Sequence, residues 1–261
     1  MKTIRSIITV VFVLTLSTGF AQSFKYNIGQ SKQIEIKNLV GEINIEEISG
    51  SQLIIEGANF PKKPARAEGL KSLYGNGAED NTEIGLQVLN QGGIIEIQGA
   101  SKKAEDAKYI FKVPKGVNVK IDYRSPFAKE TIRVVNFSNE LEISTLNRNL
   151  DLKNVTGPVV LNTTNGDINI AFSSINQEAP TSISSINGVV DITLPHSTPA
   201  KISLSTINGE IFTNFDINFE KKTKNGLSYI GGGQKINGTI NGGGVDIKLS
   251  TINDNIYLRK K

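Results

Sequence analysis

Four acidic residues are the side chains of this sequence best suited to do chemistry. They stand two or four residues after an Asn of a repeated motif: Asp151, Asp167, Asp191 and Glu210. Paired carboxylates cleave glycosidic bonds, and clusters of carboxylate oxygens bind calcium. The two alternating offsets favour a solvated outer face, and no calcium-loop spacing surrounds these acids. We therefore treat the four acids as a candidate binding face.

His196 and Ser197 form the only pair that suggests a hydrolase. His196 is the single histidine, and both residues lie in a turn between two prolines, without the strand-turn-helix setting of a nucleophile elbow. The sequence has no cysteine, which excludes disulfides, thiolate zinc sites, a cysteine nucleophile and a lipid anchor on cysteine. The sequence predicts no catalytic residue, no metal site and no cofactor.

A short motif recurs five times and sets the architecture that must position these side chains. Each copy has an aliphatic residue, two polar residues that are mostly Ser or Thr, an aliphatic residue or Thr, and an Asn. The five Asn residues are Asn147, Asn165, Asn187, Asn208 and Asn253. The first four are separated by 18, 22 and 21 residues, and residues 236–240 form an irregular copy before the last. A period of about 20 residues is typical of one coil of a β-solenoid.

The motif predicts a turn between two strands in every coil. Asn-Gly enters left-handed backbone conformations at low cost, and stacked Asn amides can form a hydrogen-bonded ladder. We assign the aliphatic residues before each Asn, such as Ile186 and Ile207, and three after it, such as Val190, to the core. An acid at Ile186 or Ile207 is then expected to destabilise the protein severely. Because isolated Asn-Gly pairs mark antiparallel hairpins, an antiparallel β-sandwich remains the alternative fold.

The rest of the chain predicts an exported all-β protein. Residues 1–21 combine a basic start, an apolar run too short to span a bilayer, and small residues before a cleavage point, as in a signal peptide. Residues 22–261 are expected to form a single elongated all-β domain. In it, residues 22–110 supply short strands with a long loop at 59–82, and residues 111–261 form the Asn-Gly repeat region. The loop is a candidate binding element of unassigned role.

Charge and hydropathy narrow the range of partners. The chain carries a net charge of +4, and removal of residues 1–21 leaves 27 basic and 25 acidic residues, or +2. The basic residues are scattered and are not interleaved with aromatic ones, so a nucleic-acid partner is not expected. No stretch after residue 21 is long and apolar enough to span a membrane as a helix.

The order of the motifs resembles a known group of proteins. Residues 113–119, 192–195 and 204–211 carry the resemblance, which is to a bacterial family of β-strand-repeat proteins labelled putative adhesins, a domain of unknown function. That family is similar to exported β-helix proteins, so the resemblance implies a parallel β-solenoid of stacked short strands. It brings no catalytic residues to transfer.

These observations predict an exported, non-enzymatic, adhesin-like protein of the cell envelope, located in the periplasm or at the cell surface. Its flat face would present Ser, Thr, Asn and Asp side chains to a glycan or an envelope protein. Two alternatives stay open: a polysaccharide-acting β-helix enzyme, which requires convergent acids, and a periplasmic regulatory partner in envelope-stress signalling. The sequence does not fix the ligand, the handedness of the solenoid or the oligomeric state.

Overall fold

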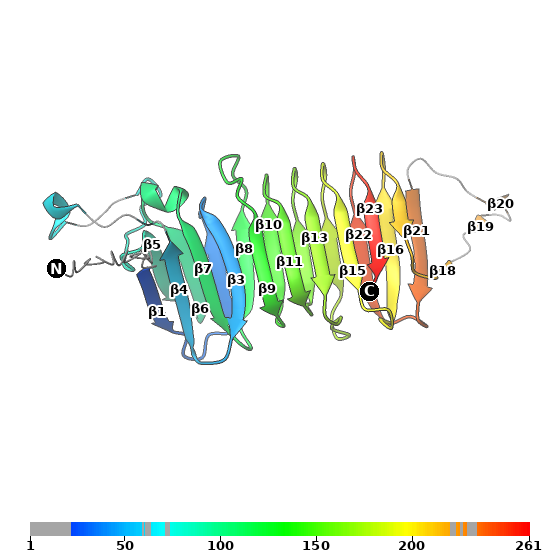
Figure 1. Cartoon of the computed structure of the whole chain (residues 1–261), viewed down its shortest axis with the longest axis horizontal. Coiled ribbons are helices and arrows are strands. Elements are labelled where there is room, and N and C mark those ends of the chain that lie inside the picture. Colours follow the sequence, from blue (N-terminus) through cyan, green and yellow to red (C-terminus); the bar gives the residue numbers. More distant parts are fainter. Residues whose placement is uncertain are drawn as a thin grey trace, which may run out of the picture.

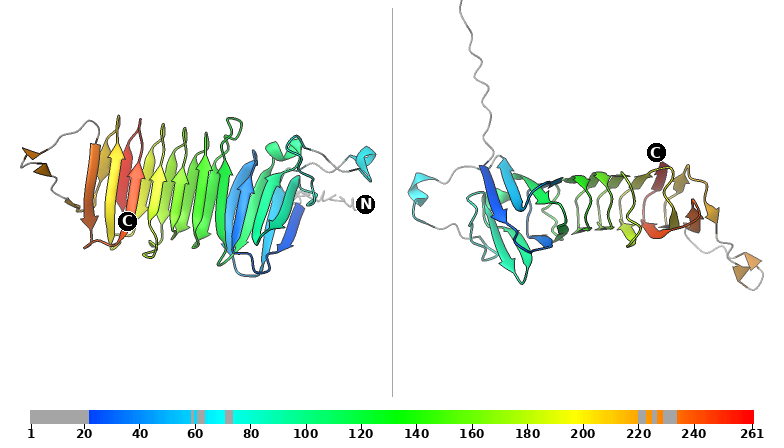
Figure 2. Two further views of the ribbon diagram at one scale, coloured as in Figure 1. Left: turned by 180° about the vertical axis from the view of Figure 1, so that it is seen from behind. Right: turned by 90° about the horizontal axis from the view of Figure 1, so that it is seen from below.

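The computed structural model describes residues 22–58, 60, 64–70, 74–219, 223–224, 227–228 and 234–261. The predicted signal peptide, residues 1–21, lies outside the described residues. Two long β-sheets lie face to face and give the molecule an elongated shape (Figures 1 and 2). Two short 3₁₀ helices, η1 (Ala65–Ala67) and η2 (Lys102–Glu105), lie near the N-terminal end.

The first long sheet, sheet A, has ten strands. In spatial order they are β1 (Gln22–Asn27), β4 (Gln52–Ala58), β7 (Lys108–Pro114), β3 (Glu42–Ile48), β9 (Ile132–Phe137), β11 (Leu150–Val155), β13 (Ile168–Phe172), β15 (Val190–Leu194), β23 (Ile256–Lys260) and β17 (Ile211–Thr213).

The second long sheet, sheet B, has eleven strands. In spatial order they are β18 (Asn218–Phe219), β21 (Gln234–Ile240), β16 (Ala200–Thr206), β22 (Val245–Ser250), β14 (Thr181–Ser184), β12 (Val159–Asn162), β10 (Leu141–Thr145), β8 (Asn118–Tyr123), β2 (Gln33–Lys37), β6 (Ile94–Gly99) and β5 (Leu86–Gln91). A separate hairpin joins β19 (Thr223–Lys224) and β20 (Leu227–Ser228).

Each coil of the chain gives one strand to each sheet. In β10–β11, β12–β13 and β14–β15, the strands of sheet B pair in parallel with each other, and so do those of sheet A. The predicted parallel β-solenoid with rungs of about 20 residues is therefore confirmed. The alternative of an antiparallel sandwich is wrong for the repeat region, because equivalent residues of successive copies lie side by side.

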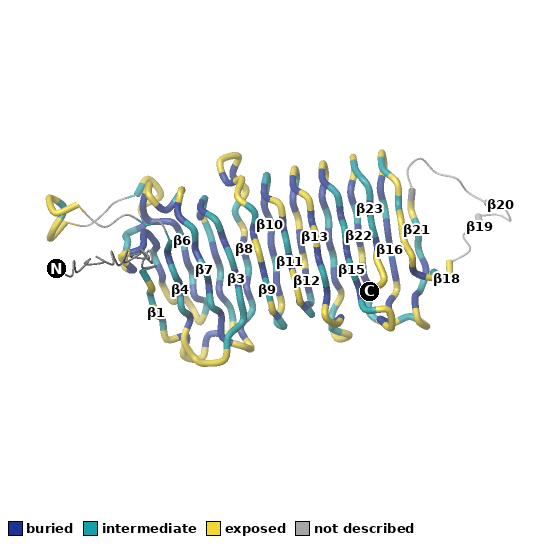
Figure 3. Tube along the Cα trace, viewed as in Figure 1, coloured by how far each residue is buried: buried dark blue, intermediate teal, exposed yellow. Residues whose placement is uncertain are grey.

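The core lies between the two sheets and follows from the period-two alternation of the strands. Aliphatic residues three positions after the motif Asn form one buried row across sheet A: Leu150, Ile168, Val190 and Ile256. Their counterparts in sheet B are Ile143, Leu161, Ile183 and Leu249. Buried positions alternate along the strands, and exposure concentrates at the turns (Figure 3).

The rungs do not follow chain order at either end of the stack. Rung β2–β3 lies between β6–β7 and β8–β9, and the last rung of the chain, β22–β23, lies between β14–β15 and β16–β17. The expectation that residues 236–240 form a further rung is wrong. They belong to β21, which pairs antiparallel with β16 and covers one edge of sheet B, because the chain turns back before the last rung.

A buried arginine, Arg148, links the rung β2–β3 to the repeat region. Arg148 is 1% exposed and takes the place that glycine has in three of the other copies. Its guanidinium donates hydrogen bonds to the carbonyls of Leu39, Val40 and Gly41 in the turn between β2 and β3. Burial lowers the pKa of Arg148 to about 10.

Candidate functional site

The five turns from sheet B to sheet A that carry the motif form one continuous surface, which we call the turn edge. Along it, the Nδ2 atoms of four motif Asn residues donate to the Oδ1 atom of the Asn in the neighbouring rung, at 2.5–2.7 Å, and Asn147 Nδ2 at the end of the row donates to Pro126 O at 3.3 Å. The spatial order is Asn147, Asn165, Asn187, Asn253 and Asn208. The structure thus places the five predicted ladder residues in one chain of hydrogen bonds, which bridges the inserted last rung.

A second row of polar side chains lies just inside the ladder. The second hydroxyl of each motif is buried, and in four rungs it donates to a backbone carbonyl of the adjoining turn. These four are Thr163, Ser185, Thr251 and Thr206, with oxygen–oxygen distances of 2.9–3.3 Å. Buried carbonyls need such partners, so this row stabilises the stacking of the turns.

The motif glycines serve close approach and not a left-handed backbone, which corrects the sequence interpretation. Neither Asn187 nor Gly188 has a positive φ, and the same holds for the other Asn-Gly copies. A Cβ on Gly188 would instead lie 2.1 Å from Gly166 O of the neighbouring turn. Because the turns stack at strand spacing, only a residue without a side chain fits at this point.

The aliphatic residue before the motif Asn points outward, against the prediction. Ile186 is 40% exposed, Ile207 is 60% exposed and Ile252 is 37% exposed. In each copy the last buried aliphatic residue of the sheet B strand and the buried hydroxyl residue two positions later face the core, so period-two alternation places the next residue on the surface. These aliphatic side chains therefore border the ladder on the outside.

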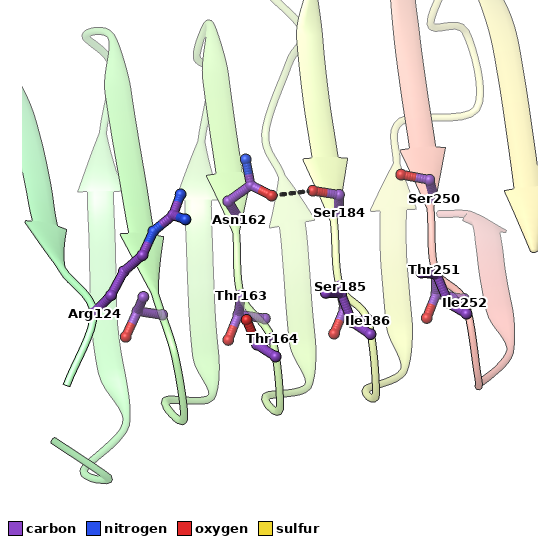
Figure 4. Close-up of a pocket in the computed structure, with 11 residues that line it drawn as sticks. Arg124, Asn162, Thr163, Thr164, Ser184, Ser185, Ile186, Ser250, Thr251 and Ile252 are labelled. Carbon is purple, nitrogen blue, oxygen red and sulfur yellow. Dashed lines mark hydrogen bonds between the residues drawn. The ribbon is translucent and has the colours of Figure 1, made fainter. Parts of the chain in front are cut away.

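A shallow groove of about 270 Å³ runs across sheet B beside the turn edge. Figure 4 shows its lining, with Arg124 at one end and, at the other, Ser250 of β22 and the two residues that follow it, Thr251 and Ile252. The remaining lining residues come from β10, β12, β14 and their turns: Thr145, Asn162, Thr163, Thr164, Ser184, Ser185 and Ile186. The groove thus combines hydroxyl and amide groups with an apolar border.

The four candidate acids do not form one stripe. Asp151 and Asp191 lie in one cross-strand row of sheet A with Asn169 between them. Arg259 binds Asp191 through Nε at 2.7 Å and NH2 at 2.8 Å, and Lys153 lies 3.4 Å from Asp151. These carboxylates are therefore engaged by cations of the same face, beside a shallow hollow of about 250 Å³.

The other two acids lie in the turns, one row away. Asp167 Oδ1 accepts a hydrogen bond from Val189 N at 2.9 Å, and Glu210 N donates to Asn255 Oδ1 at 2.8 Å. This row continues the ladder as backbone-capping contacts. The difference in offset from the motif Asn thus separates two surfaces, and the four acids do not converge on a shared ligand position.

The remaining candidates from the sequence stay apart from the groove. His196 is exposed in the turn after β15, at the opposite edge of the stack. Among the described residues, no group of three or more His, Asp and Glu side chains is arranged to hold a metal ion. No helix in the described part of the chain is long and apolar enough to cross a membrane.

The described part of loop 59–82 is tied to the N-terminal rungs. Tyr74 donates its hydroxyl to Glu105 Oε1 at 2.6 Å. This hydrogen bond, with burial, raises the pKa of Tyr74 to about 12. Asn81 forms two hydrogen bonds of 2.9 Å with the backbone of Val88. These contacts hold the loop against the rungs, and its role as a binding element stays a prediction.

Sequence reasoning missed three residues that shape the site: Arg124, Thr145 and Arg148. Arg124 follows a strand whose turn lacks the motif, so no repeat drew attention to it. Thr145 belongs to the copy that carries Arg148, but a hydroxyl residue is usual at its position, and only its neighbours in space distinguish it. The replacement of glycine by arginine at 148 was the one visible signal.

The chain matches a known family model and is similar to solved structures. The family model described as Toastrack DUF4097 matches residues 25–259. A "putative cell adhesion protein" from Clostridium sporogenes ATCC 15579 is similar at 12% identity and a TM-score of 0.43, over 93% of this chain and 100% of that one. A "putative adhesin" from Bacteroides fragilis NCTC 9343 is similar at 12% identity and a TM-score of 0.42, over 92% and 96%. No curated protein matches the chain.

Proposed function

The chain belongs to the Toastrack DUF4097 family, and from this premise we propose that it is an exported, non-enzymatic, adhesin-like binding protein of the cell envelope. The proposal includes cleavage after residue 21 and residues 22–261 as one elongated domain. Its binding surface is the turn edge with the adjacent groove, and its ligand is a glycan or an envelope protein. In this proposal, successive rungs present the same kinds of polar side chain to the ligand, so that several equivalent contacts form along the groove.

The observation that carries the proposal is the periodic polar surface of the groove. Ser184 lies in register with Asn162 on one side and with Ser250 on the other, one strand spacing apart. Strands in a sheet are about 4.8 Å apart, so hydroxyl and amide groups recur at that interval. Such a row offers both donors and acceptors to an extended polymer, without the convergent acids that hydrolysis requires.

Retention of envelope material on the immobilised chain tests this function. We expect material to be retained, and retention to fall when Ser184 and Ser250 are both replaced by Ala. Ser174→Ala is the matched control, because Ser174 is exposed at the opposite edge of the stack. Loss of the retained material after protease treatment identifies a protein ligand, and loss after periodate oxidation identifies a glycan. Absence of retention, or equal retention by all variants, would overturn the proposal.

Export is tested separately by cell fractionation and N-terminal sequencing. The expected product is found in the envelope fraction and begins at Gln22. A cytoplasmic product that begins at Met1 would contradict export, and the ligand would then have to be a molecule of the cytoplasm.

A further inference from the structure

The groove beside the turn edge differs between its two ends. Towards Ser250 it continues the regular repeat, with Ser, Thr and Ile in equivalent positions. At its other end, the adjoining rung β8–β9 has a different and longer turn, residues 124–131, without the motif. The groove therefore has one end that departs from the repeat. This end carries the guanidinium of Arg124 and the hydroxyl of Thr145, which has no hydrogen-bond partner among the described residues.

Arg124 is the only charged side chain that lines the groove. It follows β8, is exposed, and extends over the groove end towards Asn162 (Figure 4). Within the described part of the chain, its guanidinium makes no hydrogen bond or ion pair. Asp122 stands two residues earlier in register with Ser144 and does not line the groove. An unpaired guanidinium presents a planar fork of donors that matches a carboxylate.

Thr145 lies at the same end of the groove. It is 3% exposed, and its Oγ1 has no hydrogen-bond partner among the described residues. Its equivalents in the repeat donate to a carbonyl of the adjoining turn, as Ser185 does to Gly166 O at 3.0 Å. The different path of the turn at 124–131 leaves Thr145 without that carbonyl. A buried hydroxyl without a partner is costly, and a ligand group or a water that it anchors would satisfy it.

The rest of the lining suits a sugar better than a peptide strand. An incoming strand needs free backbone groups along a sheet edge, whereas the groove crosses the face of strands that are already paired on both sides. Ser250 offers a hydroxyl group and Ser184, whose hydroxyl donates to Asn162 Oδ1, offers an acceptor oxygen, while Ile186 and Ile252 supply apolar surface beside them (Figure 4). A pyranose ring carries both kinds of surface, with hydroxyl groups at its edge and C–H groups on its faces.

We propose that this groove binds an extended saccharide chain that carries carboxylates, with one carboxylate held by Arg124 at the Thr145 end. The sugar residues beyond it lie across β12, β14 and β22, and their hydroxyl groups bond to Asn162, Ser184 and Ser250. This inference rests on the proposed binding function and narrows its ligand to acidic polysaccharides.

Binding to acidic polymers and to their carboxyl-reduced forms tests the inference. The probes are polygalacturonate, alginate and hyaluronan, each immobilised beside the same polymer with its carboxylates reduced to alcohols. We expect the chain to bind at least one acidic polymer, and this binding to weaken at least tenfold on carboxyl reduction. Arg124→Gln should cause a similar tenfold loss, because it removes the charge that pairs with the carboxylate. Arg66→Gln, the same change at an exposed arginine of η1, should bind like the parent.

Thr145→Val separates a ligand contact from a structural role. Since the hydroxyl has no partner within the described chain, the isosteric valine should leave the urea midpoint equal to or above that of the parent. Affinity for the acidic polymer should nevertheless fall about fivefold, as expected for one lost hydrogen bond. Unchanged affinity would remove Thr145 from the site.

The outcomes distinguish the two proposals. Equal binding to acidic and reduced polymers, or equal losses for Arg124→Gln and Arg66→Gln, overturns the acidic-saccharide inference while the binding function stands. If none of the three acidic polymers binds but envelope material is still retained through the turn edge, the inference again fails alone. If nothing is retained and no polymer binds, both proposals fail.

Discussion

Replacement of Gly188 by Ala gives a sharp test of the stacked turns. The new Cβ would lie 2.1 Å from Gly166 O, 2.5 Å from Gly166 C and 2.9 Å from Ser185 Oγ. Real Cβ contacts shorter than 3.0 Å are essentially never seen, so the two turns must separate by about 1 Å. The obstructing atoms belong to the backbone and cannot move aside as a flexible side chain would.

This separation strains three hydrogen bonds between neighbouring turns. Asn187 Nδ2 donates to Asn165 Oδ1 at 2.7 Å, Asn187 N donates to Thr164 O at 2.8 Å, and Ser185 Oγ donates to Gly166 O at 3.0 Å. At about 1 kcal/mol for each bond, their loss lowers the free energy of unfolding by about 3 kcal/mol. For a chain of this size, the melting temperature should fall by roughly 6–12 °C.

Urea denaturation and thermal melting, followed by far-ultraviolet circular dichroism, measure this effect. Gly75→Ala is the matched control, since a Cβ on Gly75 meets no atom within 4 Å. We expect Gly75→Ala to unfold like the parent and Gly188→Ala to unfold at clearly lower urea and temperature. Equal midpoints for the two variants would show that the turns are not in contact at Gly188, and the stacking argument would fail.

The other predictions address the core, the buried arginine and the inserted last rung. Ile186→Asp should lower the free energy of unfolding by less than about 1 kcal/mol, because Ile186 is exposed, and Ile183→Asp should lower it by more than about 4 kcal/mol, because Ile183 is buried. Urea midpoints in the reverse order would contradict the assigned orientations. Arg148→Met should cost about 3 kcal/mol and raise amide exchange in β2 and β3, because it leaves three carbonyls of their turn without donors; parental exchange rates would refute this role. Deletion of residues 245–261 should speed amide exchange in both β14 and β16, since each loses its parallel partner β22, whereas exchange confined to the new C-terminus would argue against the insertion.

The sequence predicted the repeat unit well because the unit is local. The short strands expected within residues 22–110 include β2 and β6, whose residues alternate between apolar and polar, and the spacing of the motif gave the coil length. Both signals depend on side chains that face the same neighbours in every rung. Because the same pattern repeats in the sequence and in the structure, the sequence repeat predicts the structural one.

The order of the rungs was not readable, because it depends on pairings between distant segments. Ser184 pairs with Ser250 and not with Ser205, although residues 205 and 250 carry nearly the same motif. Identical motifs make identical edges, so the sequence gives no reason to choose one neighbour over the other. The covering strand β21 decides the matter, since it occupies the free side of β16 through antiparallel pairing and leaves the other side for the last rung.

The outward position of Ile186 escaped prediction for a different reason. Alternation counted back from Val190 through the turn assigns Ile186 to the core face, whereas alternation counted forward from the buried Ile183 in β14 assigns it to the surface. Ser185 is buried and its hydroxyl donates to Gly166 O of the adjoining turn, so the residue after it, Ile186, faces outward. The turn at Asn187 and Gly188 interrupts the alternation, so a single count cannot assign the residues on both of its sides to a face.

The inserted last rung links completion of the fold to completion of the groove. Ser250, Thr251 and Ile252 line the groove beside residues 184–186, although 66 residues separate the stacked Asn187 and Asn253. Contacts so distant in sequence form late, because their loop-closure entropy must be met before the contacts stabilise anything. Until the last strands enter between β14 and β16, one end of the groove has no wall and the Asn ladder is broken in two. The groove, and with it the proposed binding surface, is therefore complete only when residues 245–260 have joined the stack.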